Sequence, residues 1–184
     1  MNKALKILLW ADSLYTLSAG MLGPIYAIFV AEKVKGDILT TSLSWAVFTF
    51  VSGLTVILLS RLEEKTKETE KWVIAGYFLA ALGYIGYIFI NNVAGLFIVQ
   101  ILLGLGAAIN KPAYDAVYSR HLEKEKYVTQ WGLWEAKESM VGALAAVSGG
   151  LLVTFFSFNL LFILMACLAF LGGFIVLLQP RELI

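Results

Sequence analysis

The sequence has little of what soluble enzymes and metal-binding proteins use. It contains one cysteine, Cys167, so no internal disulfide can form, and its single histidine, His121, has no cysteine or histidine companion for a metal site. Charged residues make up 15% of the 184 residues, and the formal net charge of +1 gives no indication of nucleic-acid binding. The sequence has no paired nucleophile and base and no dinucleotide fingerprint, so we expect no enzymatic activity, no metal and no cofactor.

Apolar residues are in large excess. They make up 60% of the chain, whereas a soluble domain is about 45–50% apolar, so the surplus must face lipid. Six hydrophobic runs are long enough to cross a bilayer, which takes about 20 residues. The sequence therefore predicts an all-α membrane protein, a six-transmembrane-helix bundle in a single domain over 1–184, with helices at about 5–31, 39–60, 72–91, 95–119, 127–154 and 157–178.

The basic residues are concentrated in alternate connections. Only Lys33 and Lys35 lie in the connection after the first run, and the connections after the third and fifth runs have none. By the positive-inside rule, both termini and the charged loops 61–71 and 120–126 are predicted to be cytoplasmic, in an inner (cytoplasmic) membrane. The ten basic residues on that side are Lys3, Lys6, Arg61, Lys65, Lys67, Lys71, Arg120, Lys124, Lys126 and Arg181.

Ionisable residues lie inside three of the apolar runs, although each such charge costs about 2.5–3.5 kcal/mol on insertion scales. At helical spacing they share stripes with small residues, so the first, fourth and fifth helices can share one charge cluster. That cluster is either a substrate or ion site, or an ion-pair network that only holds helices together. Lys111 and Asp115 can pair within their own helix, whereas Lys137 is expected to point about 100° away from Glu138. The six residues are Asp12, Lys111, Asp115, Glu135, Lys137 and Glu138.

The third and sixth hydrophobic runs lack charged residues along their apolar stretches. The third run lines up only small residues and Tyr87, and the sixth has no charge from 160 to 178, so we expect both to be lipid-facing flanks. Gly23-Pro24 and Pro112 are expected to interrupt or kink the first and fourth helices. Five aromatic residues lie near expected helix ends, a position typical of the headgroup layer: Trp10, Tyr26, Trp45, Trp72 and Trp131.

Three stretches resemble motifs of the major facilitator superfamily of transporters. In the fourth helix, Gly104-Leu105-Gly106 leads to Asn110-Lys111-Pro112-Ala113, similar to that family's Gly-x-Gly and Asn-x-Pro-Ala stretch. The fifth helix ends in Gly149-Gly150, like the family's antiporter motif, although Ala145-Ala146 replaces the preceding Gly-Pro pair. The loop after the second helix resembles a degenerate form of the family's gating-loop motif, built here from Arg61, Glu64 and Lys65.

The resemblance covers the whole chain and implies one six-helix half, the N-terminal one, of a fold that normally has twelve helices. It implies that the first and fourth helices line a central cavity. Asp12 is then the first candidate for proton or cation coupling and Glu138 the second, while Gln100 replaces the arginine usual in proton-coupled antiporters. The expected substrate or ion pathway comprises Asp12, Tyr15, Thr16, Asn110, Lys111, Asp115, Glu135 and Glu138.

These features favour a secondary transporter that moves a small molecule by alternating access. A single half is expected to work as a parallel homodimer, because the charge bias orients every copy the same way, or with a second six-helix half. The intramembrane acids outnumber the bases, which favours a cationic ligand. Two alternatives stay open: a non-transporting accessory or assembly protein of the membrane, and an N-terminal fragment of a twelve-helix transporter.

Overall fold

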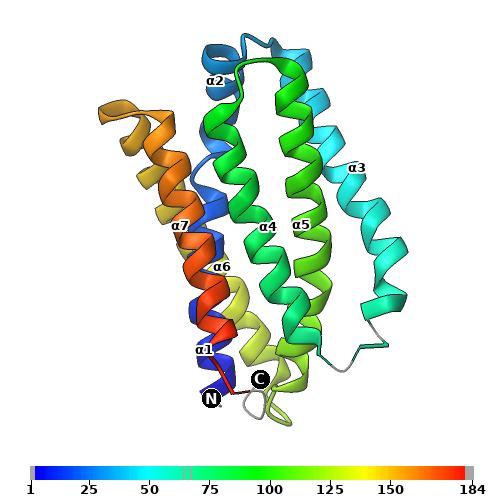
Figure 1. Cartoon of the computed structure of the whole chain (residues 1–184). Helices are drawn as coiled ribbons and strands as arrows, with labels where there is room; N and C mark the ends of the chain where they lie inside the picture. The colour runs from blue at the N-terminus through cyan, green and yellow to red at the C-terminus, as the bar shows by residue number, and fades with distance from the viewer. Residues whose placement is uncertain (1–2, 64, 67, 181–184) are drawn as a thin grey trace.

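The computed structural model describes residues 3–63, 65–66 and 68–180. Within these ranges the chain is helical, and six of its helical spans are long and apolar enough to cross a membrane (Figure 1). This confirms the all-α, six-helix fold that the hydrophobic runs predict. The helices are α1 Lys3–Gly20, α2 Tyr26–Phe29, α3 Ile38–Glu63, α4 Thr69–Phe89, α5 Val93–Arg120, α6 Tyr127–Phe155 and α7 Phe158–Leu177.

The first span is the irregular one. It runs over Lys3–Val34, but α1 ends at Gly20 and a 3₁₀ turn over Gly23–Ile25 separates it from α2. Pro24 lacks the amide hydrogen that a continuous helix needs, so the expected interruption is found here. Pro112 does not have this effect, because α5 continues through it.

Polar side chains cap the N-termini of three helices. The Asn92 side chain accepts a hydrogen bond from the Gly95 amide at the start of α5, and Ser157 caps α7 in the same way. Before α3, the Asp37 carboxylate accepts bonds from both the amide and the hydroxyl of Thr40, each at 2.7 Å. These hydrogen bonds lower the pKa of Asp37. Short capped connections make sequence neighbours antiparallel.

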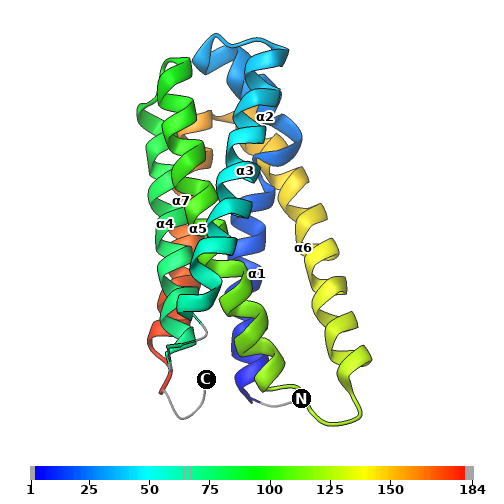
Figure 2. The ribbon, with the colours of Figure 1, turned by 90° about the vertical axis from the view of Figure 1, so that its right-hand side faces the viewer.

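The helices form an open row rather than a closed ring. Neighbours pack in the order α3, α5, α4, α7, α1, α6, and α3 and α6 lie on either side of α1 without packing extensively against each other (Figure 2). The start of α1, the end of α7 and the α3–α4 and α5–α6 connections share one end of the bundle (Figures 1 and 2). The basic connections therefore lie together, as the positive-inside rule requires.

The third and sixth spans pack within the row of helices, and their expected contact with lipid stays a prediction. These spans, α4 and α7, have 44% of their residues buried, whereas α3 and α6 have 11%. The charge-free stripe of α4 packs against neighbouring helices, since a Cβ on Gly83 would collide with Leu103 of α5. A stripe of small residues indicates close helix packing, and the absence of charge does not distinguish that from contact with lipid.

Glycine sets two of the closest helix crossings. A Cβ on Gly149 of α6 would collide with the carbonyl oxygen of Met21, just beyond α1. A Cβ on Gly104 of α5 would lie 2.7 Å from the carbonyl oxygen of Phe48 in α3. The next residue along α6, Gly150, has open space around it. Gly104 and Gly149 therefore let α3 and α6 approach the central helices.

Candidate functional site

A cavity of about 550 Å³ opens among α1, α3, α5 and α6. We call it the wide cavity. It lies on the side of the bundle where α3 and α6 stand apart (Figure 2). Six of the eight pathway residues expected from the sequence line it. The full lining is Asp12, Tyr15, Thr16, Ala19, Gly20, Ser52, Ala107, Asn110, Lys111, Tyr114, Trp134, Glu138 and Gly142.

Asp12 is the most heavily bonded acid at the cavity. Its Oδ2 atom lies 2.5 Å from the ammonium of Lys137 and accepts the indole N–H of Trp134 at 2.9 Å. Its Oδ1 atom accepts the hydroxyl of Tyr77 at 3.2 Å. The Asp12 and Lys137 side chains are only 8% and 11% exposed. Both carboxylate oxygens of Asp12 are therefore engaged in holding α1 to α6 and α4.

Glu138 is bonded on one oxygen. Its Oε1 atom accepts the Thr16 hydroxyl at 2.5 Å and forms an ion pair with Lys137. Among the described residues, no hydrogen bond or ion pair reaches its Oε2 atom, and its side chain is 33% exposed. Glu138 is thus the acid with a free oxygen at the cavity, whereas Asp12 is satisfied.

Lys111 and Asp115 form their own pair on α5. Their charged atoms are 3.0 Å apart, as the four-residue spacing allows, and both side chains are more than a third exposed. The Lys111 ammonium also lies 4.2 Å from the centre of the Trp134 ring. Trp134 therefore contacts both this pair and Asp12, and links α5 to the buried cluster.

The remaining sequence-predicted residues are placed less centrally. Glu135 is exposed on α6 and does not line the wide cavity, and neither does Asp115. Asn110 lines it but donates its side-chain N–H to the Val73 carbonyl, which fastens α5 to α4. Of the gating-loop motif, Glu64 lies outside the described residues, the side chain of Arg61 is not described, and Lys65 is exposed.

Three important residues were missed or misjudged from the sequence. Lys137 was expected to point away from Glu138, but its flexible side chain reaches both Glu138 and Asp12. Trp134 and Tyr77 complete the bonds to Asp12 and were not singled out. The sequence did carry a signal for Trp134, because it lies one position before Glu135 and three before Lys137 on the polar part of the fifth run.

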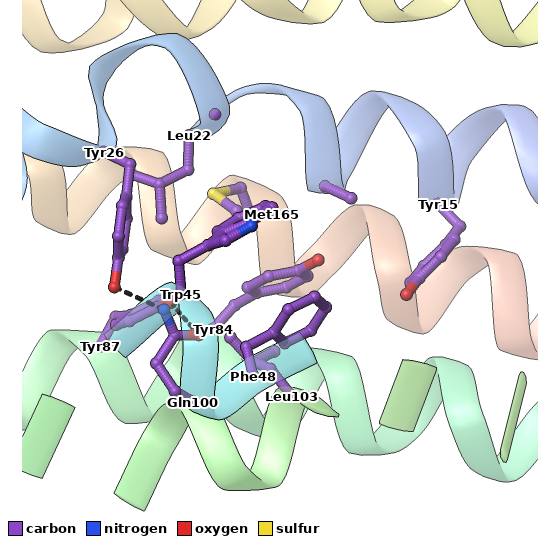
Figure 3. Close-up of a pocket in the computed structure, with 12 residues that line it drawn as sticks. Tyr15, Leu22, Tyr26, Trp45, Phe48, Tyr84, Tyr87, Gln100, Leu103 and Met165 are labelled. Atoms are coloured by element: carbon purple, nitrogen blue, oxygen red, sulfur yellow. Dashed lines mark hydrogen bonds between the residues drawn. The ribbon is translucent and has the colours of Figure 1, made fainter. Parts of the chain in front are cut away.

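A second cavity, of about 150 Å³, lies beside the break in the first span (Figure 3). We call it the aromatic cavity. No charged residue is among those that line it. The lining residues come from both sides of the break and from α3, α4, α5 and α7: Tyr15, Ala19, Leu22, Gly23, Tyr26, Trp45, Phe48, Tyr84, Tyr87, Gln100, Leu103 and Met165.

Three of the polar side chains that line the aromatic cavity form one chain of hydrogen bonds. Gln100 donates to the Tyr26 hydroxyl at 2.5 Å and accepts from Tyr87 at 3.3 Å (Figure 3). The Tyr26 hydroxyl also bonds Ser44 at 2.6 Å. Tyr26 is only 7% exposed, so its ring contacts protein, and its expected depth near the headgroup layer stays a prediction. Uncharged Gln100 can be buried here because both of its amide atoms have partners.

Comparison with known proteins identifies the family. The model of the Major Facilitator Superfamily matches residues 8–183. The chain is also 26% identical over 164 residues to the "Uncharacterized MFS-type transporter YitZ" of Bacillus subtilis (strain 168), an alignment covering 87% of this chain and 96% of that protein. Since nearly all of that relative is matched, it is itself only about as long as one six-helix half. The chain therefore belongs to the Major Facilitator Superfamily, with the fold of one of its halves, and is an integral, multi-pass membrane transporter.

Proposed function

We propose that this chain is a half-transporter that works as a parallel homodimer in the cytoplasmic membrane and moves a small molecule by alternating access. Its termini and basic loops face the cytoplasm. The observation that carries the proposal is the wide cavity, which holds buried charges. One copy of the chain leaves this cavity open between α3 and α6, which do not pack extensively against each other. A second copy facing this opening completes the wall.

The two helices at the edges of the opening carry exposed apolar side chains. Large apolar side chains are exposed on α3, including Phe50 at 71%, and on α6, including Leu144 at 66%. Such faces belong in lipid or against another protein. Because the basic loops orient every copy alike, two copies are related by an axis along the membrane normal, which is how the two halves of larger family members are related.

Alternating access can be tested without knowing the substrate. Cys167 is replaced by serine, and a single cysteine is introduced as Ala19→Cys, at a position that lines both cavities. A membrane-impermeant maleimide is added to right-side-out vesicles and, separately, to inverted vesicles. We expect labelling in both, since the position is exposed to each side in turn.

The matched control is Ala94→Cys, an exposed position at the start of α5 that lines neither cavity. It should react in right-side-out vesicles alone. If Ala19→Cys reacts from one side only, the protein does not alternate. If it reacts from neither side, the cavity is dry and a static accessory role replaces transport.

A further inference from the structure

The two cavities adjoin along the first span. Tyr15 and Ala19 line both of them. On one side of this junction lies Glu138, and on the other lies an uncharged enclosure of aromatic rings. One ligand can therefore occupy both cavities if it carries a charged group at one end and an aromatic group at the other.

The charged end is a cation. Asp12, Glu138 and Lys137 together carry one net negative charge, because one base is shared by two acids. The Oε2 atom of Glu138 has no hydrogen-bond or ion-pair partner among the described residues. Tyr114 adds an independent sign of a missing partner. Its hydroxyl is buried at the wide cavity and interacts electrostatically with Asp12, but no hydrogen bond of normal geometry satisfies it. A buried hydroxyl without a hydrogen-bond partner is destabilising, and a bound ammonium can donate a hydrogen bond to its oxygen.

The apolar end is one aromatic ring. The aromatic cavity, at about 150 Å³, has the size of an apolar protein cavity that holds a single benzene ring. Its walls present the faces and edges of Tyr26, Trp45, Phe48 and further rings, which favour offset or edge-to-face contacts with a ligand ring. It has no carboxylate, so a charge placed inside it would lack a counter-ion.

The distance between the two ends is short. Thr16 holds Glu138 at 2.5 Å, and Ala19, at the junction, lies three residues farther along the same helix. Three helical residues rise by about 4.5 Å. This rise suits a short alkyl spacer between the two ends of the ligand.

We propose that the site binds an arylalkylamine, with its ammonium on Glu138 and its ring in the aromatic cavity. This deepens the proposed transport function and rests on it for the site. Bound in this way, the ligand completes the bonds of Glu138 and fills the aromatic cavity. An amine without a ring, or a ring without an amine, makes only half of these contacts.

Isothermal titration calorimetry on the purified full chain in lipid nanodiscs tests the ligand class. The probe is 2-phenylethylamine, compared with uncharged 2-phenylethanol and ringless butylamine. We expect 2-phenylethylamine to bind at least tenfold more tightly than either analogue. Equal affinity for 2-phenylethanol would overturn the role of Glu138, and equal affinity for butylamine would overturn the role of the aromatic cavity.

Two substitutions with matched controls locate the binding. Glu138→Gln should weaken 2-phenylethylamine binding at least tenfold, whereas Glu135→Gln, one turn away and outside the cavity, should not change it. Ala19→Leu, which fills the junction, should also abolish binding, whereas Ala94→Leu should not. If all four variants bind equally, the proposed site is wrong.

Failure of the proposed ligand class is distinguishable from failure of the proposed transport function. Labelling of Ala19→Cys from both sides, with no binding of 2-phenylethylamine, would leave a half-transporter for some other ligand. Binding of the amine with labelling from one side only would leave a binding protein that does not transport.

Discussion

Lys137 of α6 lies 2.5 Å from Asp12 of α1, and the same ammonium forms an ion pair with Glu138. One buried base therefore neutralises one acid and part of another. The arrangement assigns different tasks to the two acids that the sequence ranked first and second for coupling. Asp12 fastens helices together, whereas Glu138 is the acid that we propose binds the ligand, since no bond among the described residues reaches its Oε2 atom.

Substitutions at this ion pair should have unequal effects on stability. Lys137→Met leaves two acids side by side without a base, so we expect a loss of about 3–5 kcal/mol in the free energy of unfolding. Asp12→Asn should lower the free energy of unfolding by less, because Lys137 keeps its ion pair with Glu138 and the asparagine still accepts a hydrogen bond. Thermal unfolding in mild detergent measures both.

The double variant Asp12→Asn with Lys137→Met provides the control. Its loss should be smaller than the sum of the two single losses, because the two side chains interact directly. Strict additivity would contradict the ion pair, and so would a larger loss for Asp12→Asn than for Lys137→Met.

The crossing of α6 over the end of α1 makes a second prediction. Gly149→Ala should destabilise the protein by about 1–3 kcal/mol, because the new methyl group collides with the Met21 carbonyl. Gly150→Ala has open space and should be neutral or stabilising, by up to about 1 kcal/mol, since alanine favours a helix. Thermal unfolding of the two variants side by side tests this, and equal effects would contradict the crossing.

The start of α3 should be sensitive to acid. The Thr40 amide holds the pKa of Asp37 below its ordinary value of 3.8, so the cap is present above that value and is lost as the pH falls through the lowered pKa. The chemical shift of the Thr40 amide should therefore titrate with a midpoint below 3.8. Asp37→Asn should remove the transition, and a midpoint at or above 3.8 would contradict the hydrogen bond.

The sequence predicted the helices well because a lipid-spanning helix must be apolar over its whole length. It also predicted six of the thirteen residues that line the wide cavity, since a charge such as Asp12 or Lys111 is retained in an apolar helix only where it faces away from lipid. The Gly-Pro break was predictable from the missing amide hydrogen at Pro24.

What could not be predicted depends on how the helices pack. The small residues of α4, Gly83 among them, suit a buried crossing as well as a lipid-facing surface, so the pattern did not show that this stripe packs against α5. Helical spacing gives the direction of a Cα–Cβ bond but not the reach of a long side chain, which is why Lys137 was placed wrongly. The aromatic cavity joins residues far apart in sequence, such as Tyr26 and Gln100, and no local pattern connects them.

The central claim is that a second copy closes the cavity opening, and a cross-link between copies tests it most directly. Phe50 lies about 18 Å from the start of α3 and Leu144 about 16 Å from the end of α6, at the same end of the bundle, so the two positions share a depth. Two chains with Cys167→Ser and different tags are co-expressed, one with Phe50→Cys and the other with Leu144→Cys. Leu171→Cys, at an exposed position of α7, replaces the second cysteine as the control.

Oxidation in native membranes should join the Phe50→Cys and Leu144→Cys chains into a dimer that carries both tags, and should leave the Leu171→Cys pair monomeric. No mixed dimer from α3 and α6, or an equally strong one through α7, would contradict the parallel half-transporter.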